Sequence, residues 1–138
     1  MYFTITKKSL ALILFITVLS FGILMQFFSV KASGVELCTN AQRVEFIESL
    51  GIDLQNDEFS QKEVVIPQEF GDVYRKYNRL QQTAGFDLNA YQGKQVTVYT
   101  YRSNDDKLVN LMIYKEKLIG GDIADVNVGG QMAALKGK

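Results

Sequence analysis

Residues 95–102 read Gln-Val-Thr-Val-Tyr-Thr-Tyr-Arg, the most regular stretch of the sequence. Side chains at positions 96, 98 and 100 alternate with those at positions 97, 99 and 101, a period of two that predicts a β-strand. A polar turn at residues 103–106 leads to a second apolar run at 108–114. The pair Lys115-Glu116 separates that run from a third at 118–126. Short connections between successive strands predict an antiparallel meander.

Two amphipathic helices are predicted ahead of the meander. Thr39-Asn40-Ala41-Gln42 has the composition of a capping box, and apolar residues recur at helical spacing until Gly51 ends the run. A second apolar stripe has the same spacing and stops at Gly85. Its members are Phe70, Val73, Tyr74, Tyr77, Leu80 and Ala84. We interpret both stripes as core-facing, and the tyrosines as core packing rather than a binding platform.

The predicted fold is a small two-layer α+β domain, in which two helices pack on one face of the antiparallel β-meander. The β-branched run at 62–66 is expected to be an edge strand, because Pro67 cannot donate to a ladder. Gly129-Gly130 and the Lys-Gly-Lys terminus are expected to form a fraying tail. The pattern does not decide which face of residues 95–102 the helices cover.

A long apolar segment near the N-terminus predicts one transmembrane helix. The 21 residues from Leu10 to Val30 carry no charge. As a helix they would extend about 31 Å, which matches a hydrocarbon core of roughly 30 Å. Lys7 and Lys8 precede the segment and only Lys31 follows, so the positive-inside rule places the N-terminus in the cytoplasm.

This segment divides the chain into two parts. Residues 1–32 are expected to be a cytoplasmic stub and signal-anchor, and residues 33–138 an extracytoplasmic domain held at the cell membrane by a single pass. Cleavage before Ser33 is the alternative, since Val30-Lys31-Ala32 has small residues at the right spacing. The apolar stretch is longer than the usual 7–15 residues of a signal core, which favours the uncleaved anchor.

The composition excludes several partners and chemistries. All 15 acidic residues lie from Glu36 onward, against 12 of the 15 basic residues, so this part has a net charge of −3. A mildly acidic domain without a basic stripe argues against nucleic acid as a partner. The sequence has no histidine, the commonest general base and a common metal ligand. Its one cysteine rules out a disulfide within the chain.

We do not expect an enzyme, a metal site or a cofactor. Ser-x-x-Lys and Gly-x-Ser-x-Gly motifs are absent, and Cys38 has no histidine to make it a thiolate. Val35-Glu36-Leu37 lacks the small residues that precede a lipid-attachment cysteine. Asp105-Asp106 falls short of the six to eight oxygens that calcium needs. A small cell-envelope hydrolase with two facing carboxylates stays open as the alternative.

Four residues make up a candidate interaction patch. Tyr99 and Tyr101 share one strand face and would line an exposed surface beside Arg102 if the helices covered the opposite face. Paired glycines at Gly120-Gly121 would let a ligand approach closely, and Asp122 could accept a hydrogen bond or a cation. We interpret this last motif first as a strand bulge in which Asp122 bonds a neighbouring backbone amide.

Several motifs along the domain are specific in combination. They are Phe46-Ile47-Glu48-Ser49-Leu50-Gly51, Val64-Val65-Ile66-Pro67-Gln68-Glu69-Phe70, Val73-Tyr74 with Tyr77-Asn78-Arg79-Leu80-Gln81, Gly85-Phe86-Asp87-Leu88, Tyr91-Gln92-Gly93-Lys94, Tyr99-Thr100-Tyr101 and Ile119-Gly120-Gly121-Asp122-Ile123. With these motifs the chain resembles DUF4830, a domain of unknown function from Gram-positive, often spore-forming bacteria. The resemblance implies an N-terminal anchor and an extracytoplasmic setting, and it implies no activity.

Three positions depart from the pattern of that family. Ile52 stands where a tryptophan is usual, Lys115-Glu116 where an aspartate-glycine turn is usual, and Ala124 where a cysteine is usual. Any function of that cysteine would be lost here. We expect a non-catalytic, membrane-tethered interaction or sensing module with a cell-envelope protein as its partner. A loose fold-level analogy to PepSY-type modules agrees with this expectation.

Overall fold

The computed structural model describes residues 34–127 and 129–137, so the predicted span from Leu10 to Val30 lies outside the described residues. Within those residues no helix has the length and apolar character needed to cross a membrane. The first four elements are α2 (Asn40–Ser49), β1 (Ser60–Val65), α3 (Asp72–Thr83) and the short 3-10 helix η1 (Leu88–Tyr91). Four strands follow, β2 (Gln95–Arg102), β3 (Lys107–Tyr114), β4 (Lys117–Asp125) and β5 (Met132–Ala134).

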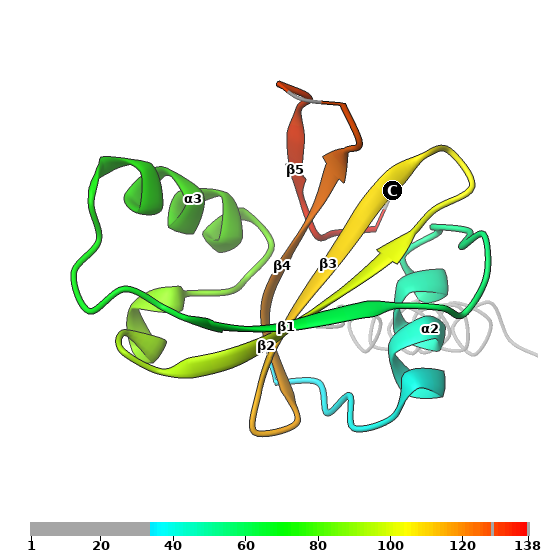
Figure 1. Ribbon diagram of the computed structural model, residues 1–138. Coiled ribbons are helices and arrows are strands. Elements are labelled where there is room, and N and C mark those ends of the chain that lie inside the picture. The colour runs from blue at the N-terminus through cyan, green and yellow to red at the C-terminus, as the bar shows by residue number, and fades with distance from the viewer. Residues whose placement is uncertain (1–33, 128, 138) are drawn as a thin grey trace, which may run out of the picture. The chain divides into compact units, whose positions relative to one another are not determined.

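The five strands form one sheet in the order β1-β2-β3-β4-β5, and every neighbouring pair is antiparallel (Figure 1). The α+β class, the meander and the edge position of β1 are therefore confirmed. Strand β2 has the predicted bounds, and β3 and β4 each begin one residue earlier than predicted. Strict alternation with short polar turns was a sufficient signal for these strands.

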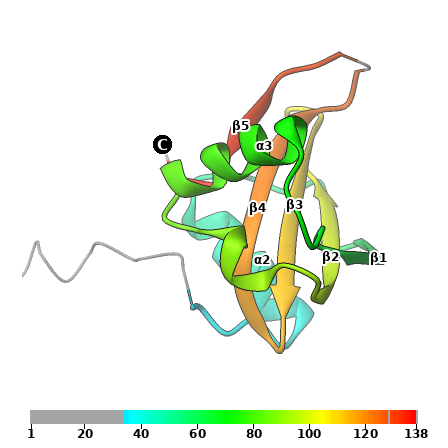
Figure 2. The ribbon, with the colours of Figure 1, turned by 90° about the vertical axis from the view of Figure 1, so that its left-hand side faces the viewer.

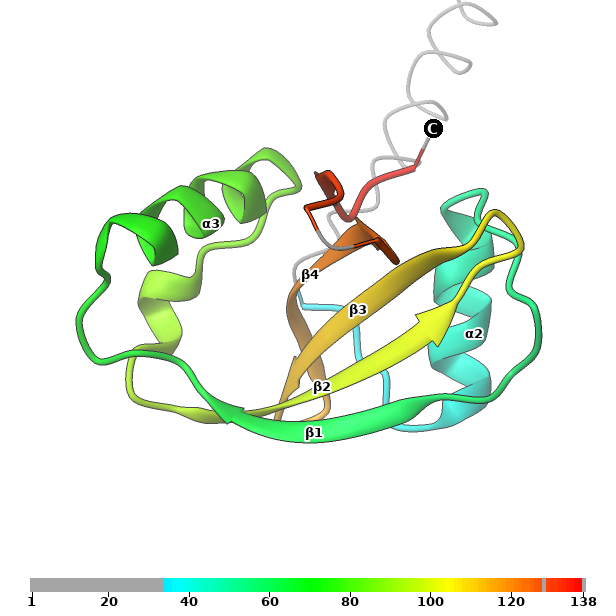
Figure 3. The same ribbon diagram turned by 45° about the horizontal axis from the view of Figure 1, so that its top comes forward.

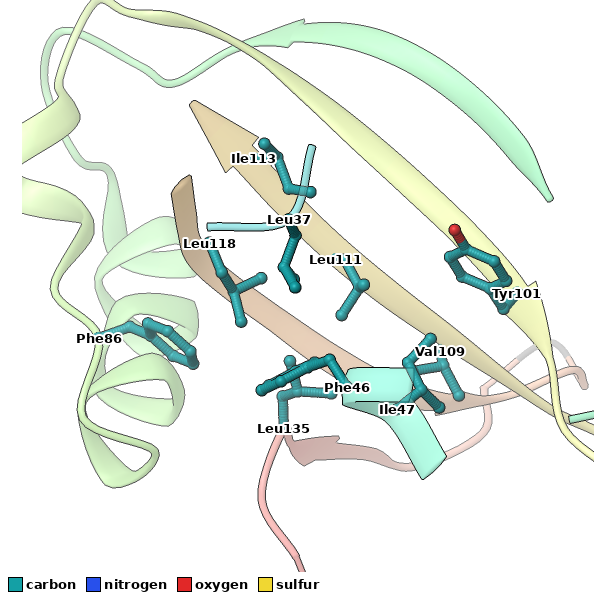
Figure 4. Close-up of a cluster of buried hydrophobic side chains, with 10 residues drawn as sticks. All are labelled: Leu37, Phe46, Ile47, Phe86, Tyr101, Val109, Leu111, Ile113, Leu118 and Leu135. Atoms are coloured by element: carbon teal, nitrogen blue, oxygen red, sulfur yellow. The ribbon is translucent and has the colours of Figure 1, made fainter. Parts of the chain in front are cut away.

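The expected fraying tail is wrong, because the chain returns after Gly129 to form β5. Met132 pairs with Ala124 and Ala134 pairs with Asp122 on β4. Leu135, the next residue, is fully buried in the core cluster that also contains Phe46 of α2 (Figure 4). A strand of three residues is too short to show alternation, so the sequence carried no periodic signal for it.

The predicted two-layer packing is also wrong, because the two helices cover opposite faces of the sheet (Figures 1 and 2). Phe46 and Ile47 of α2 pack in one cluster with Tyr101 and Leu111. The partly buried Tyr74 and Tyr77 of α3 pack against the other cluster, which contains Val96, Val98 and Met112. Tyr101 and Val98 point to opposite faces because side chains alternate along a strand. Since both faces are apolar, each needs its own cover, and the domain has three layers.

The capping box of α2 is confirmed, whereas the predicted core face of α3 is partly wrong. Thr39 accepts from the backbone N–H of Gln42, and the Gln42 side chain accepts from the backbone N–H of Thr39. In α3 the buried residues are Asn78 and Gln81, which lie outside the predicted apolar stripe, and Val73, a member of that stripe, is 85% exposed.

Hydrogen bonds explain why α3 turns two polar side chains inward. The Asn78 side chain accepts from the backbone N–H of Leu88 at 2.8 Å and donates to Asp87 at 2.9 Å. Gln81 Oε1 accepts from the backbone N–H of Gly121 at 2.9 Å. The bonds from Leu88 and Gly121 each satisfy a buried backbone N–H that would otherwise lack a partner.

The turn between β3 and β4 holds two non-glycine residues in the left-handed region. Lys115 has φ of 47° and Glu116 has φ of 67°, the pattern of a two-residue hairpin turn that favours Asn-Gly or Asp-Gly. The departure from the aspartate-glycine pattern therefore places a Cβ where the backbone disfavours it.

Replacing Glu116 with glycine is expected to raise the free energy of unfolding by about 1 kcal/mol, because glycine adopts positive φ without a Cβ clash. Glu45→Gly, in the exposed interior of α2, should lower it by about 1 kcal/mol. Urea unfolding of residues 33–138, followed by far-ultraviolet circular dichroism, measures both. A loss of stability in Glu116→Gly would contradict the turn geometry.

Candidate functional site

A hollow of about 290 Å³ lies on the sheet face that α3 covers. Its floor is formed by the central strands, through Val98, Asn110, Met112 and Asp122. Tyr74 and Tyr77 of α3 form one wall, and Lys62, Val64 and Val65 of β1 form the other. Figure 3 shows α3 and β1 on either side of the central strands. A concave, mostly apolar site with a few polar groups is the usual form of a ligand pocket.

A chain of hydrogen bonds ends at Asp122 in this hollow. Tyr77 Oη donates to Asp122 Oδ2 at 2.7 Å, and Asn110 Nδ2 donates to Asp122 Oδ1 at 2.8 Å. Thr100 Oγ1 in turn donates to Asn110 Oδ1 at 2.7 Å. Burial and the neighbouring Asp122 carboxylate raise the pKa of Tyr77 far above its usual value, so this hydroxyl keeps its proton.

Asp122 itself is 4% exposed and makes no ion pair with a described residue. A carboxylate has about four lone-pair sites, of which these two bonds use two. The remaining acceptor capacity fits a cationic or hydrogen-bond-donating group. The expected bond from a neighbouring backbone amide is not among these contacts, because the donors to Asp122 are the side chains of Tyr77 and Asn110.

The outer edge of β1 forms the open margin of the hollow. Ile66 directs its backbone N–H and C=O toward the β2 side, to Lys94 and Gly93. Because these groups alternate along an antiparallel strand, those of Gln61, Glu63 and Val65 point outward. In the described part of the chain, none of the backbone hydrogen bonds made outside the strand ladders involves these three residues. They are free to pair with an added strand.

The structure separates the four residues of the predicted interaction patch. Asp122 belongs to the hollow, whereas Tyr99 and Tyr101 lie on the opposite face beneath α2. Tyr101 is only 1% exposed, so it forms no open surface. Arg102 is exposed and pairs with Asp106 at 3.0 Å. An exposed tyrosine surface was expected only if both helices covered the sheet face opposite Tyr99 and Tyr101. Because each face is covered by one helix, that surface does not form.

A buried arginine, which the sequence did not predict, explains the position of these tyrosines. The Arg43 guanidinium lies over the Tyr99 ring at 3.9 Å and over the Phe59 ring at 5.1 Å. Its Nε donates to Tyr101 Oη at 2.8 Å, and that hydroxyl donates to Asn40 at 2.7 Å. Arg43 is 4% exposed, so this arrangement is a structural cation–π cluster.

The paired glycines lie where backbones and side chains approach β4 closely. A bulge occurs beside them, at the point where Met112 and Ile113 shift their register against β4. A Cβ on Gly121 would lie 2.4 Å from the carbonyl oxygen of Asn110, and a Cβ on Gly120 would lie 3.0 Å from Gln81 Oε1. A bulge is therefore present next to the glycines, as expected, whereas Gly120 and Gly121 themselves pair in register with Met112 and Leu111. Their lack of a side chain makes room for α3 and the β3 backbone.

The acidic residues and the cysteine do not gather into a metal or nucleophile site. Among the described residues, no three His, Cys, Asp or Glu side chains are grouped to hold a metal ion. Asp105 accepts from Ser103 and pairs with Lys107 at 3.5 Å, as expected for a polar turn. Desolvation and the nearby Glu116 carboxylate raise the pKa of the Cys38 thiol, which therefore stays protonated at neutral pH.

Comparisons with known proteins give one match. A family model described as a domain of unknown function (DUF4830) matches residues 46–127. No curated protein and no solved structure matches the chain. The matched range includes the hollow, the β1 edge and the Asp122 network.

Proposed function

The chain belongs to the family described as a domain of unknown function, DUF4830, whose description assigns no activity, and we propose its function from the site itself. It is a membrane-tethered, extracytoplasmic, non-catalytic binding module. Its ligand is an extended segment of a cell-envelope protein that pairs with β1 and places a basic side chain in the hollow. The observation that carries this proposal is an unpaired strand edge directly beside a pocket that contains a buried carboxylate.

Main-chain pairing accounts for an extended ligand. An added strand would bond the outward groups of Gln61, Glu63 and Val65, and alternate side chains of that strand would face the hollow. Val65 is 63% exposed and offers an apolar contact at this margin. Backbone bonds supply affinity in strand addition, and the pocket supplies selectivity.

Charge accounts for the choice of a basic side chain. Among the residues that the structure describes, Asp122 is the only carboxylate that lines the hollow. Its hydrogen bonds with Tyr77 and Asn110 hold it in place for an ammonium or guanidinium group. Hydrolysis by a carboxylate pair needs two facing acids, so a single one supports binding rather than glycoside cleavage.

The tether and its topology rest on the sequence. A charge-free stretch from Leu10 to Val30 has membrane-crossing length, and its flanking lysines favour a cytoplasmic N-terminus. The partner is therefore sought outside the cell membrane.

Photo-crosslinking in intact cells tests the binding site. A crosslinking amino acid at Val65 of the full chain should capture one dominant envelope protein, and the same group at Glu48, on the exposed face of α2, should not. Mass spectrometry of the adduct identifies the partner and the contacting segment. Equal capture at both positions, or none at Val65, would reject the β1 site.

Replacing Gln61 with proline is expected to reduce the Val65 adduct about tenfold, because it removes one outward N–H and one main-chain bond to the ligand. The matched control is Val64→Pro, which removes an inward N–H and should instead destabilise the pairing of β1 with β2. Circular dichroism separates the two effects. Full capture by a folded Gln61→Pro variant would contradict strand addition.

A further inference from the structure

A second hollow, of about 710 Å³, lies between α3 and β5 and is strongly apolar. Val73, Tyr77 and Leu80 of α3 line it together with Met132 of β5. Val73 is 85% exposed and Met132 is 48% exposed, so this apolar surface has no cover among the described residues. We call it the α3–β5 groove. An exposed apolar patch with a polar margin marks a contact surface.

The groove is basic on a domain that is acidic overall. Lys76 and Arg79 line it, and α3 carries three basic residues against one acidic residue. That acidic residue, Asp72, is already paired with Arg75. The chain from Glu36 onward has a net charge of −3, so the positive groove is a local reversal of sign. Apolar residues beside lysine and arginine are typical of surfaces that lie in a membrane interface.

The chain enters the domain on the same sheet edge where α3 and β5 meet. Along the outer edge of β4, Leu118 bonds Gly34 and Val35. Farther along this edge Gly121 bonds Gln81 of α3, and Asp122 then pairs with Ala134 of β5. The entry point, the helix and the last strand therefore occupy successive positions on one edge.

The length of the connection limits how far this edge can lie from the membrane. Three residues lie between Val30, the end of the predicted span, and Gly34, so four Cα-to-Cα steps connect them. Fully extended, these steps reach about 14 Å at most. We propose that the α3–β5 groove docks on the anionic outer leaflet of the membrane that holds the chain, with Val73 and Leu80 at the acyl boundary and Lys76 and Arg79 at lipid phosphates.

This inference rests on the proposed tether, and it goes beyond the proposed function by giving the domain a fixed orientation. A lipid surface fits better than a protein ligand, because the tether holds the groove near the bilayer and the cations match anionic headgroups. Docking by α3 would leave β1, the opposite edge of the sheet, open to a partner.

The test uses the full chain, one copy per lipid nanodisc, in a Cys38→Ser background that removes the only cysteine. A fluorophore is attached at Val73→Cys or, as the matched control, at Glu45→Cys on the exposed face of α2. With anionic lipid, iodide in solution should quench the Val73 label much less than the Glu45 label, and doxyl-labelled lipid should quench only the Val73 label. Each charge removed, by Lys76→Gln or Arg79→Gln, should reduce the docked population about fivefold relative to the undocked one.

Each of the following results would contradict the proposed docking of the groove on the membrane. If the chain stays in the discs but iodide quenches both labels equally, the tether stands and the docking is wrong. If the chain leaves the discs in urea, the tether fails and the docking fails with it. Protection of the Val73 label in detergent without lipid, or only when two copies share a disc, would mean that protein covers the groove.

Discussion

Replacing Arg43 with alanine should lower the free energy of unfolding by about 3 kcal/mol. The variant loses two desolvated cation–π contacts, with Tyr99 and Phe59, and the bond to Tyr101 Oη. It also loses the bonds that Nη1 donates to the carbonyls of Leu37 and Cys38. A cavity between α2 and the sheet would remain, because the guanidinium fills the space between aromatic rings.

Urea unfolding of residues 33–138 measures this loss of stability. Two further variants serve as comparisons. Arg43→Lys keeps the charge but lacks the planar fork, so it should recover less than half of the stability. Arg102→Ala, which removes an exposed ion pair with Asp106, should change stability by less than about 1 kcal/mol. Equal effects of Arg43→Ala and Arg102→Ala would show that the buried cluster contributes no more than a surface pair.

Replacing Gly121 with alanine is expected to cost about 3 kcal/mol, a large effect for one added methyl group. The new Cβ would lie 2.4 Å from the backbone oxygen of Asn110 and 2.7 Å from Leu135 Cδ2. The Asn110 oxygen belongs to the neighbouring strand and cannot move without disturbing the β3–β4 ladder. Thermal unfolding of the variant should show a clearly lowered Tm.

The adjacent Gly120 supplies the matched comparison. There a Cβ would meet Gln81 Oε1 at 3.0 Å and Leu88 Cδ2 at 3.2 Å, both ends of side chains that can shift. Gly120→Ala should therefore cost about 1 kcal/mol. A Gly120→Ala variant less stable than Gly121→Ala would contradict the close approach of β3 and β4 at this position.

Local patterns predicted the central elements well. Strand β2 followed from strict alternation, and α2 followed from a capping box whose two reciprocal bonds involve only Thr39 and Gln42. The family resemblance is confirmed by the match over residues 46–127. The strand and the helix cap depend on residues that are close together in the sequence, so the spacing of those residues is enough to predict them.

Long-range features could not be predicted in this way. Alternation that is apolar on both faces, as at Val98 and Tyr99, is equally consistent with helices on one side or on both. Arginine is seldom buried, so nothing in the sequence indicated that Phe59, which lies sixteen residues after Arg43, would cover its charge. The Asp122 network joins four elements, α3, β2, β3 and β4, and only the aspartate was a candidate site residue in the sequence.

The pairing of β5 affects the order in which the domain folds. Leu135, which follows β5, is fully buried in the core shared with Phe46 of α2, a residue far away in the sequence. Contacts between residues distant in sequence require the closure of a long loop, which slows their formation. We therefore expect this part of the core to form late, after the local pairing of β2 with β3 and of β3 with β4.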